Sequence, residues 1–171
     1  MKWGMIFAAG LAVGVLIALA TQQFFFPPLI MPVFSPEDGD KVIAFIDSAE
    51  KSIDIEVYVF TSRNVIEALE RAKERGVAIR IIIERNVISG QNDATYRELA
   101  SKGFNIRYAS RNYALTHAKT IITDGTAVLV GSHNLSNSAL YENREASVII
   151  RDIATVAEFG NVFEKDWLLA S

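Results

Sequence analysis

The sequence predicts an α/β domain whose mixed, largely parallel β-sheet is flanked by helices on both faces, with a membrane helix before it. Three observations support this. From about residue 52 to 108, β-branched strand patterns alternate with amphipathic helical patterns, which is the order of βαβ units. Further on, two strand patterns flank Asp124-Gly125, a strong hairpin signal. At the start, Trp3 to Ala20 carries no charged residue.

Residues 1–23 are predicted to be an N-terminal transmembrane anchor. As a helix, the 18 uncharged residues from Trp3 to Ala20 would span about 27 Å, close to the hydrocarbon thickness of a bilayer. A cleaved signal peptide is the alternative, because Lys2 gives a basic start and Ala18-Leu19-Ala20 fits a cleavage site near Ala20. With Lys2 inside, we expect a single-pass protein with a cytoplasmic N-terminus and its folded domain outside, or else a secreted or periplasmic domain.

Residues 24–34 contain three of the four prolines and are predicted to be a stiff juxtamembrane linker, because proline disfavours regular helices and central strands. The folded domain is predicted over residues 35–171. Ser35 followed by Pro36 and acidic residues resembles the start of a capped helix.

Within this domain, helical and strand patterns follow one another in order. Helices are expected at about residues 36–49, 65–75, 92–102 and 136–141, and Asp152 is expected to cap a final amphipathic helix. Strands are expected at 52–60, 77–83, 104–108, 117–123, 126–130 and 144–150.

Composition excludes several classes of function. The chain has no cysteine and only two histidines, which excludes disulfides and thiolate sites and argues against a histidine-rich metal centre. Its formal net charge is −3, which argues against a strongly basic nucleic-acid-binding protein, although local basic patches remain compatible with it.

The stretch from His117 to Asn134, HAKTIITDGTAVLVGSHN, concentrates the chemistry. His117 and Lys119 are two positions apart on a strand and so share a side. A histidine can attack phosphorus, and a neighbouring ammonium can neutralise the growing negative charge. Ser132 and Asn134 end the return strand and can complete a phosphate cradle. Gly131 lets the backbone come close, and Asp124 is expected to act in the turn at the far tip.

Each of these residue types is ordinary in isolation, but six specified positions in fixed register are improbable by chance. The stretch resembles the phospholipase D superfamily, whose pattern His-x-Lys-x4-Asp-x6-Gly-Ser-x-Asn it meets at every specified position. Asn143-Arg144-Glu145 also resembles the family, in which a glutamate after the motif typically bonds and orients the catalytic histidine. The strand and helix order looks like that of the small, single-motif members, bacterial endonucleases and mitochondrial-surface proteins.

The resemblance implies a phosphodiester hydrolase in which His117 forms a phosphohistidine and a second histidine protonates the leaving group. Because one motif supplies one such histidine, the second is expected from His117 of another subunit in a homodimer. Lys119, Ser132 and Asn134 would surround the phosphate, and Glu145 would orient His117. No metal and no cofactor is expected. His133 could instead be a second histidine within one chain, but adjacent residues of an extended segment point to opposite sides.

The motif leaves the substrate open. A nuclease is narrowly favoured, because several arginines and Tyr108 and Tyr113 could contact nucleic acid; the arginines are Arg80, Arg85, Arg97, Arg107 and Arg111. A phospholipase acting on head groups at the membrane is the alternative. A non-catalytic phosphate-binding scaffold is the third hypothesis, and the complete motif argues against it.

Overall fold

The structure is a computed structural model that describes residues 28–87 and 90–171. The predicted membrane anchor, residues 1–23, lies outside the described residues, as do residues 24–27 of the predicted linker. Across the part of the chain that the structure describes, no helix is long and apolar enough to cross a bilayer.

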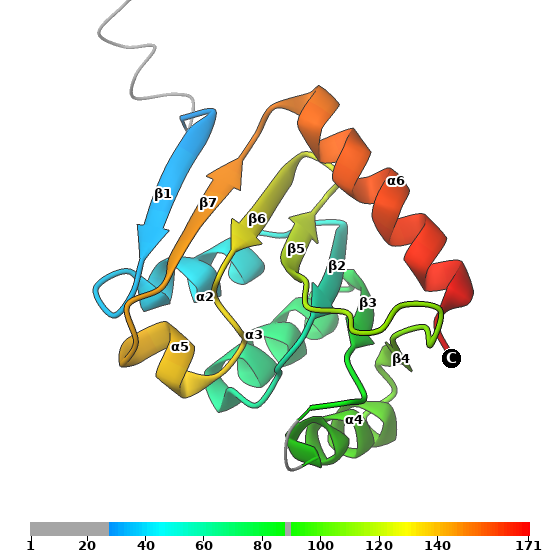
Figure 1. Cartoon of the computed structure of the whole chain (residues 1–171). Helices are drawn as coiled ribbons and strands as arrows, with labels where there is room; N and C mark the ends of the chain where they lie inside the picture. The colour runs from blue at the N-terminus through cyan, green and yellow to red at the C-terminus, as the bar shows by residue number, and fades with distance from the viewer. Residues whose placement is uncertain (1–27, 88–89) are drawn as a thin grey trace, which may run out of the picture.

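A single seven-stranded sheet forms the centre of the domain, with the strand order β1-β7-β6-β5-β2-β3-β4 (Figure 1). The strands are β1 (Ile30–Phe34), β2 (Ser52–Val57), β3 (Ala78–Ile83), β4 (Asn105–Tyr108), β5 (Lys119–Thr123), β6 (Ala127–Gly131) and β7 (Ala146–Ile150). The predicted βαβαβ order from residue 52 to 108 is confirmed: β2, β3 and β4 are neighbours and run parallel.

The sheet is mixed, as expected, but the expectation that it is largely parallel is wrong. Only β2–β3 and β3–β4 pair in parallel, whereas β1–β7, β7–β6, β6–β5 and β5–β2 are all antiparallel. Between β5 and β6 the reason is the connection length. The tight Asp124-Gly125 turn reverses the chain between β5 and β6, and antiparallel neighbours need no crossover helix.

The predicted linker ends earlier than residue 34, because Ile30–Phe34 is strand β1. It pairs antiparallel with β7, with Ile30 opposite Ile150 and Phe34 opposite Ala146. Pro32 lies within this strand. A proline cannot donate to a ladder, but β1 is the last strand of the sheet, and an edge strand tolerates it. The folded part therefore begins at least five residues before Ser35.

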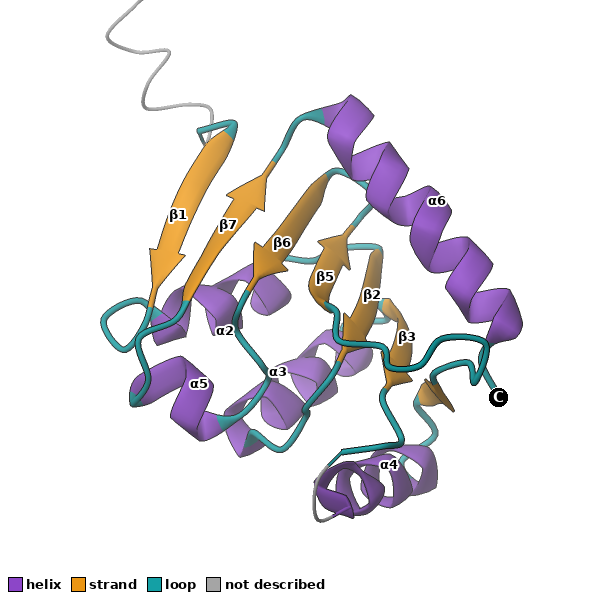
Figure 2. Ribbon diagram, in the orientation of Figure 1, coloured by secondary structure: helices purple, strands orange, loops and turns teal. Residues whose placement is uncertain are grey.

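Helices cover both faces of the sheet (Figure 2). Helices α2 (Gly39–Asp47) and α3 (Arg63–Glu74) pack on one face, and the long α6 (Ile153–Leu169) packs on the other. Helix α4 (Gln91–Ser101) lies beside β4, and the short α5 (Asn137–Tyr141) lies beside α2. Each main face has its own apolar cluster, with Val42, Leu69 and Ile55 in one and Ile122, Phe163 and Trp167 in the other.

The ends of these helices agree with the sequence in two places and differ in one. Ser136 caps α5 and Asp152 caps α6, each accepting a hydrogen bond from a backbone N–H three residues on. Helix α2, however, begins at Gly39 and not next to Ser35. The Ser35 hydroxyl instead donates to the carbonyl of Asn143 at 2.9 Å, so it joins the end of β1 to the segment that enters β7.

Candidate active site

The predicted motif lies at one end of the sheet, on both ends of the β5–β6 hairpin. Since β2 and β6 run antiparallel to β5, the end of β2, the start of β5 and the end of β6 meet at the same edge. His117 lies just before β5, and Ser132 and Asn134 lie just after β6. The N–H of Tyr58 donates to the carbonyl of Ala118 at 2.9 Å, which ties the segment bearing His117 to the end of β2.

His117 and Lys119 are in contact, as their two-residue spacing predicts. Lys119 Nζ lies 3.1 Å from His117 Nδ1 and 3.2 Å from Nε2, and it donates to the His117 carbonyl at 2.9 Å. Lys119 is only 8% exposed, whereas His117 is exposed. Burial lowers the pKa of Lys119, and the negative charge of Glu145 opposes that shift. The pair therefore places an exposed imidazole against the ammonium group of a buried lysine, at one end of the sheet.

The ring of Tyr58 supports both members of this pair, a role that the sequence analysis missed. Its centroid lies 4.5 Å from that of His117 and 5.3 Å from Lys119 Nζ. Aromatic faces attract cations and pack against other rings, so Tyr58 restricts where both side chains can go. Tyr58 follows directly after the end of β2. Its position beneath His117 depends on the antiparallel pairing of β2 with β5.

Asn134 is oriented by the backbone of the neighbouring segment. Its side-chain oxygen accepts a hydrogen bond from the N–H of Val59 at 3.3 Å. That leaves the amide Nδ2 with its two hydrogens for another acceptor, such as a phosphate oxygen. An open polar groove of about 580 Å³ lies beside it, lined by Asn134, Thr61 and serines of the 136–138 segment among others.

Glu145 does not make the expected bond with His117. Its Oε2 accepts a hydrogen bond from Ser132 Oγ at 2.5 Å, and its Oε1 accepts one from Asn143 Nδ2 at 3.2 Å. The expectation that Glu145 orients His117 is thus not met within this chain, because β7 presents Glu145 to Ser132 across the β6–β7 pair. Its charge still acts on Lys119. Ser132 is likewise held by Glu145, with its hydroxyl oxygen also accepting from the N–H of Ala146.

Gly131 and Asp124 have structural roles in the β5–β6 hairpin. A side chain at Gly131 would overlap Ser147 and the backbone of Ala146, so only glycine fits where β6 leaves the sheet. Asp124, at the far tip of the hairpin, adopts a positive φ of 55°. Its carboxylate accepts hydrogen bonds from the N–H groups of Glu50, Lys51 and Ser52.

His133 lies beneath the site and cannot face the same substrate as His117. It is 1% exposed, and its Nδ1 lies 2.7 Å from Ser147 Oγ. Its Nε2 has no hydrogen-bond partner among the described residues, and burial lowers its pKa. The alternative in which His133 supplies the second histidine within one chain is therefore wrong, because alternation turned this residue inward.

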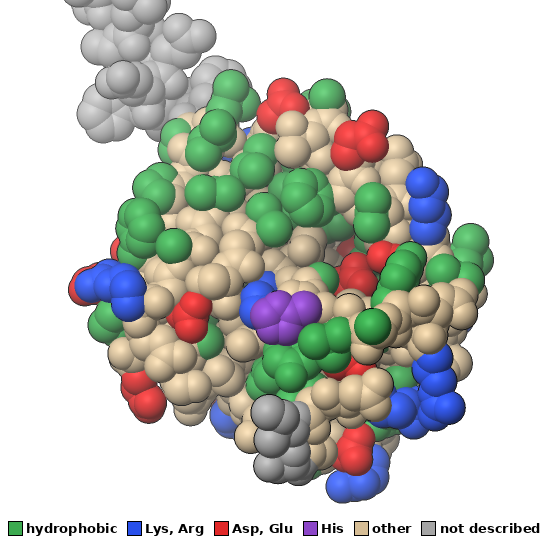
Figure 3. Space-filling view, in the orientation of Figure 1, with side chains coloured by type: hydrophobic (Ala, Val, Ile, Leu, Met, Phe, Trp, Pro, Cys, Tyr) green, Lys and Arg blue, Asp and Glu red, His purple; other side chains and the backbone are tan. Residues whose placement is uncertain are grey.

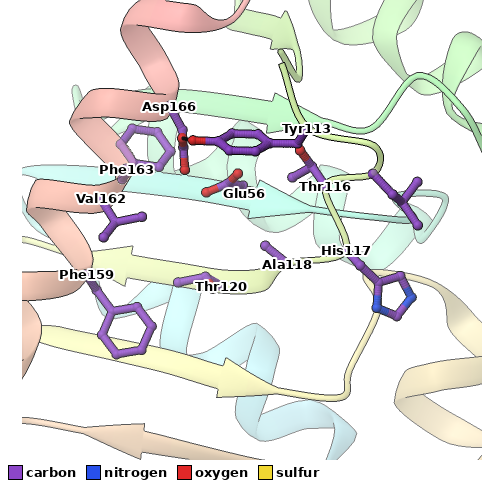
Figure 4. Close-up of a pocket in the computed structure, with 11 residues that line it drawn as sticks. Glu56, Tyr113, Thr116, His117, Ala118, Thr120, Phe159, Val162, Phe163 and Asp166 are labelled. Carbon is purple, nitrogen blue, oxygen red and sulfur yellow. Dashed lines mark hydrogen bonds between the residues drawn. The ribbon is translucent and has the colours of Figure 1, made fainter. Parts of the chain in front are cut away.

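A pocket of about 340 Å³ adjoins His117 on the α6 side of the sheet (Figure 4). Glu56 of β2 projects into it, and Tyr113, Thr116 and Asp166 surround that carboxyl group. Glu56 was not among the site residues predicted from the sequence. The available signal was its position: it alternates with Ile55 and Val57, so it belongs to the opposite sheet face, which α6 covers.

Known proteins resemble this chain over most of the described domain. Residues 42–167 match the family model described as "Cardiolipin synthase, PLD-like domain". Phospholipase D of Rickettsia conorii is 31% identical over 137 residues, covering 79% of this chain and 66% of that protein. Mitochondrial cardiolipin hydrolase of Xenopus tropicalis is 27% identical over 127 residues, covering 74% of this chain. The chain spans 60% of the length of that hydrolase.

Among solved structures, Nuc of Salmonella typhimurium, a phospholipase D family member, superposes with a TM-score of 0.77 at 31% identity. That match covers 83% of this chain and 95% of Nuc. NucT of Helicobacter pylori, at 22% identity and a TM-score of 0.69, shares the fold. With the complete motif gathered at one sheet edge, these matches establish that the chain belongs to the phospholipase D superfamily.

Proposed function

We propose that this protein is a phosphodiester hydrolase that acts through a phosphohistidine on His117 and releases head groups from membrane phospholipids. The observation that carries the reaction is the contact between exposed His117 and buried Lys119, 3.1 Å apart, at the edge where Asn134 offers its amide. The superfamily membership supports the same reaction class.

Each residue then has a role in the two displacements. The His117 ring attacks phosphorus, and the bond to the leaving alcohol breaks. Lys119 neutralises the charge that grows on the non-bridging oxygens, and the amide of Asn134 donates hydrogen bonds to them. Ser132, which donates a hydrogen bond to Glu145, lines the phosphate cradle. Water then attacks the phosphohistidine and frees the phosphate product. The cation comes from Lys119, so the proposed reaction needs no metal.

The second histidine comes from a second copy of this chain. A general acid must protonate the leaving oxygen and later activate the water. His133, the other histidine of the chain, is buried against Ser147 and unavailable for that role. We therefore propose a homodimer in which two copies of His117 face one phosphate across a two-fold axis.

The surface around His117 supports a lipid substrate. Figure 3 shows hydrophobic side chains gathered on the face that carries the exposed histidine. Tyr113, Leu115 and Val162 line the adjoining pocket and are 43–52% exposed. Exposed apolar residues next to a site are typical of surfaces that meet a membrane. The N-terminal anchor, also a proposal, would hold this face near the bilayer, with the domain on the outer side.

The basic and aromatic residues suggested for nucleic acid are partly engaged elsewhere. Arg80 pairs with Asp54 and Glu164, and Arg107 donates to the Trp167 carbonyl. Tyr108 stacks on Tyr96 with centroids 4.0 Å apart, and the Tyr113 hydroxyl donates to Asp166. For this reason we favour a phospholipid over nucleic acid as the proposed substrate. The nuclease remains the second candidate, because Arg85, Arg97 and Arg111 have no carboxylate partner among the described residues.

The test is a parallel assay of the purified full chain in detergent, with EDTA present. Its substrates are phospholipid vesicles, single- and double-stranded nucleic acid, and bis-p-nitrophenyl phosphate. We expect head-group release that His117→Ala abolishes. Cleavage of nucleic acid without head-group release would restore the nuclease. Loss of all activity in EDTA would contradict the mechanism, and failure to cleave any phosphodiester without EDTA would favour the non-catalytic scaffold.

A further inference from the structure

His117 belongs to a segment of the chain that forms neither a helix nor a strand. Residues 109–118 join β4 to β5 without regular secondary structure, so no ladder of sheet hydrogen bonds fixes the histidine. A nucleophile needs such fixing, since a misplacement of about 1 Å can cost about a hundredfold in rate. Bonds from this segment to neighbouring elements therefore have to hold the ring in place.

Two hydrogen bonds bracket His117, one on each side along the chain. The N–H of Thr116 donates to Glu84 Oε2 at 2.8 Å, and the carbonyl of Ala118 accepts from the N–H of Tyr58 at 2.9 Å. Glu84 directly follows β3, and Tyr58 directly follows β2. The two neighbours of the histidine are thus bound to the ends of two adjacent parallel strands.

Glu84 is a buried carboxylate that holds backbone groups. It is 4% exposed, and no lysine or arginine among the described residues forms an ion pair with it. Besides the bond from Thr116, its Oε1 accepts from the N–H of Asn86 at 2.7 Å. Burying a carboxylate costs free energy unless hydrogen bonds offset it. Here both offsetting bonds come from loop backbone, and one of them fixes the segment that carries His117.

Asn92, in the first turn of α4, binds both residues of the bracket. It is 1% exposed. Its Nδ2 donates to the carbonyl of Tyr58 at 2.7 Å and to that of Glu84 at 2.8 Å, and its Oδ1 accepts from the N–H of Phe60 at 2.9 Å. Two carbonyls need hydrogens and one N–H needs an oxygen, so these partners fix the orientation of the amide. One side chain therefore sets the spacing between the ends of β2 and β3.

We propose that Asn92 and Glu84 are positioning residues for His117. Asn92 holds the carbonyls of Tyr58 and Glu84, and these two residues hold the backbone on either side of the histidine. Tyr58 also packs its ring against the imidazole. Neither Asn92 nor Glu84 touches the phosphate. The inference rests on the proposed function, since it concerns the nucleophile of that same site.

The first experiment measures hydrolysis of bis-p-nitrophenyl phosphate by the full chain in detergent, with isosteric variants that keep the interior filled. Asn92→Asp loses both donors, and Glu84→Gln leaves one acceptor oxygen for two N–H groups. We expect kcat to fall about tenfold in Asn92→Asp and about threefold in Glu84→Gln. KM should stay within about twofold, because the loss is in attack and not in binding. If Asn92→Asp does not fold, Asn92→Ala removes the same donors and takes its place.

The matched control is Thr95→Val. Thr95 lies on the same helix, is 5% exposed and donates to the carbonyl of Phe60 at 2.6 Å, so the variant removes a buried bond from α4 that reaches neither Tyr58 nor Glu84. Its kcat should stay within about twofold of that of wild type. An equal fall in Thr95→Val and Asn92→Asp would overturn the proposal, because general loosening of α4 would explain both. Wild-type kcat in Asn92→Asp or Glu84→Gln would overturn the role of that residue.

Nuclear magnetic resonance of the histidine rings tests the placement without turnover. The chain has two histidines, so an untagged protein gives one set of ring signals from each, and His117→Ala assigns them. The two positioning variants should shift or broaden the His117 signals, which the Tyr58 ring influences, and leave those of His133 in place. The control should change neither set. Unchanged His117 signals in both positioning variants would overturn the proposal.

The two experiments separate this inference from the proposed function. If wild type cleaves no phosphodiester but the ring signals respond as expected, the proposed function fails and the positioning of His117 stands. If His117-dependent hydrolysis proceeds and both positioning variants keep the wild-type kcat and ring signals, the positioning fails alone.

Discussion

Glu56 is a carboxyl group whose surroundings oppose its ionisation. Burial, and to a lesser degree the negative charge of Asp166, raise its pKa from 4.5 to about 7. Besides Asp166 of α6, the ionisable side chains that share the pocket are Tyr113 and His117 of the segment before β5. Between about pH 4.5 and about 7 the folded protein therefore holds a proton at Glu56 that the unfolded chain has already released.

Glu56→Gln should stabilise the protein at pH 8 and leave its stability nearly unchanged at pH 4. Because the pKa is raised on folding, the free energy of unfolding falls as pH rises from about 4.5 to about 7, by up to about 3 kcal/mol. Glutamine has the same shape and no charge, so it removes that loss. Urea unfolding of both proteins at the two pH values measures the difference. An equal effect at both would contradict the raised pKa.

Gly131→Ala should destabilise the protein by about 2–3 kcal/mol, the cost of overpacking. A Cβ at Gly131 would overlap Ser147 and the backbone of Ala146, forcing β6 away from β7 where Ser132 is held. Gly160→Ala is the matched control, because a Cβ there meets nothing within 4 Å. Alanine in the middle of α6 should stabilise by about 0.5–1 kcal/mol. Thermal unfolding of both variants shows whether each substitution raises or lowers the stability. Similar changes in the two variants would contradict the predicted overlap at Gly131.

At the scale of elements, the β5–β6 hairpin depends on a tie to the start of β2. Asp124 accepts hydrogen bonds from the N–H groups of Glu50, Lys51 and Ser52. Burial acts to raise the pKa of Asp124, but these donors outweigh it, so the pKa is lowered. The far tip of the hairpin is thereby fixed, and with it the register that sets His117 and Asn134 at the opposite end.

Asp124→Ala should lower the free energy of unfolding by about 2–4 kcal/mol, since it leaves three backbone donors without their acceptor. Asp124→Asn keeps an acceptor and tolerates the positive φ, so its loss should be smaller. Urea unfolding at neutral pH ranks the two. Because the pKa is lowered on folding, the difference between wild type and Asp124→Asn should shrink as pH falls through the pKa of Asp124. If the difference between wild type and Asp124→Asn does not change with pH, the charge of Asp124 does not contribute to these hydrogen bonds.

The hairpin and the motif were predictable from sequence because both depend on neighbours along the chain. Asp124-Gly125 fixes the turn, and the turn brings His117 close to Asn134. Strand β1 was not predictable in this way, because its partner Ile150 lies 120 positions from Ile30. For the same reason, the bond from Ser132 to Glu145 and the burial of Glu56 under α6 required the register of β6 with β7 and the packing of a distant helix.

At the scale of the whole molecule, one chain carries half of the proposed reaction centre. It offers one exposed histidine, with Lys119 and Asn134 beside it, at an edge that is open to solvent. The other histidine is buried. If two copies of His117 must meet one phosphate, a dimer in which one copy lacks His117 has no complete centre, and the two subunits cannot compensate for each other.

This arrangement predicts how activity falls when His117→Ala subunits are mixed into wild type. With random exchange at equal proportions, about a quarter of the dimers carry two intact chains, so activity should drop to about a quarter of that of undiluted wild type at the same total protein. Independent sites in each chain would leave about half. Bis-p-nitrophenyl phosphate hydrolysis, measured after unfolding and refolding the mixture, distinguishes these two expected activities. Mixing with Glu158→Gln subunits should leave activity near the wild-type value, because that variant keeps His117.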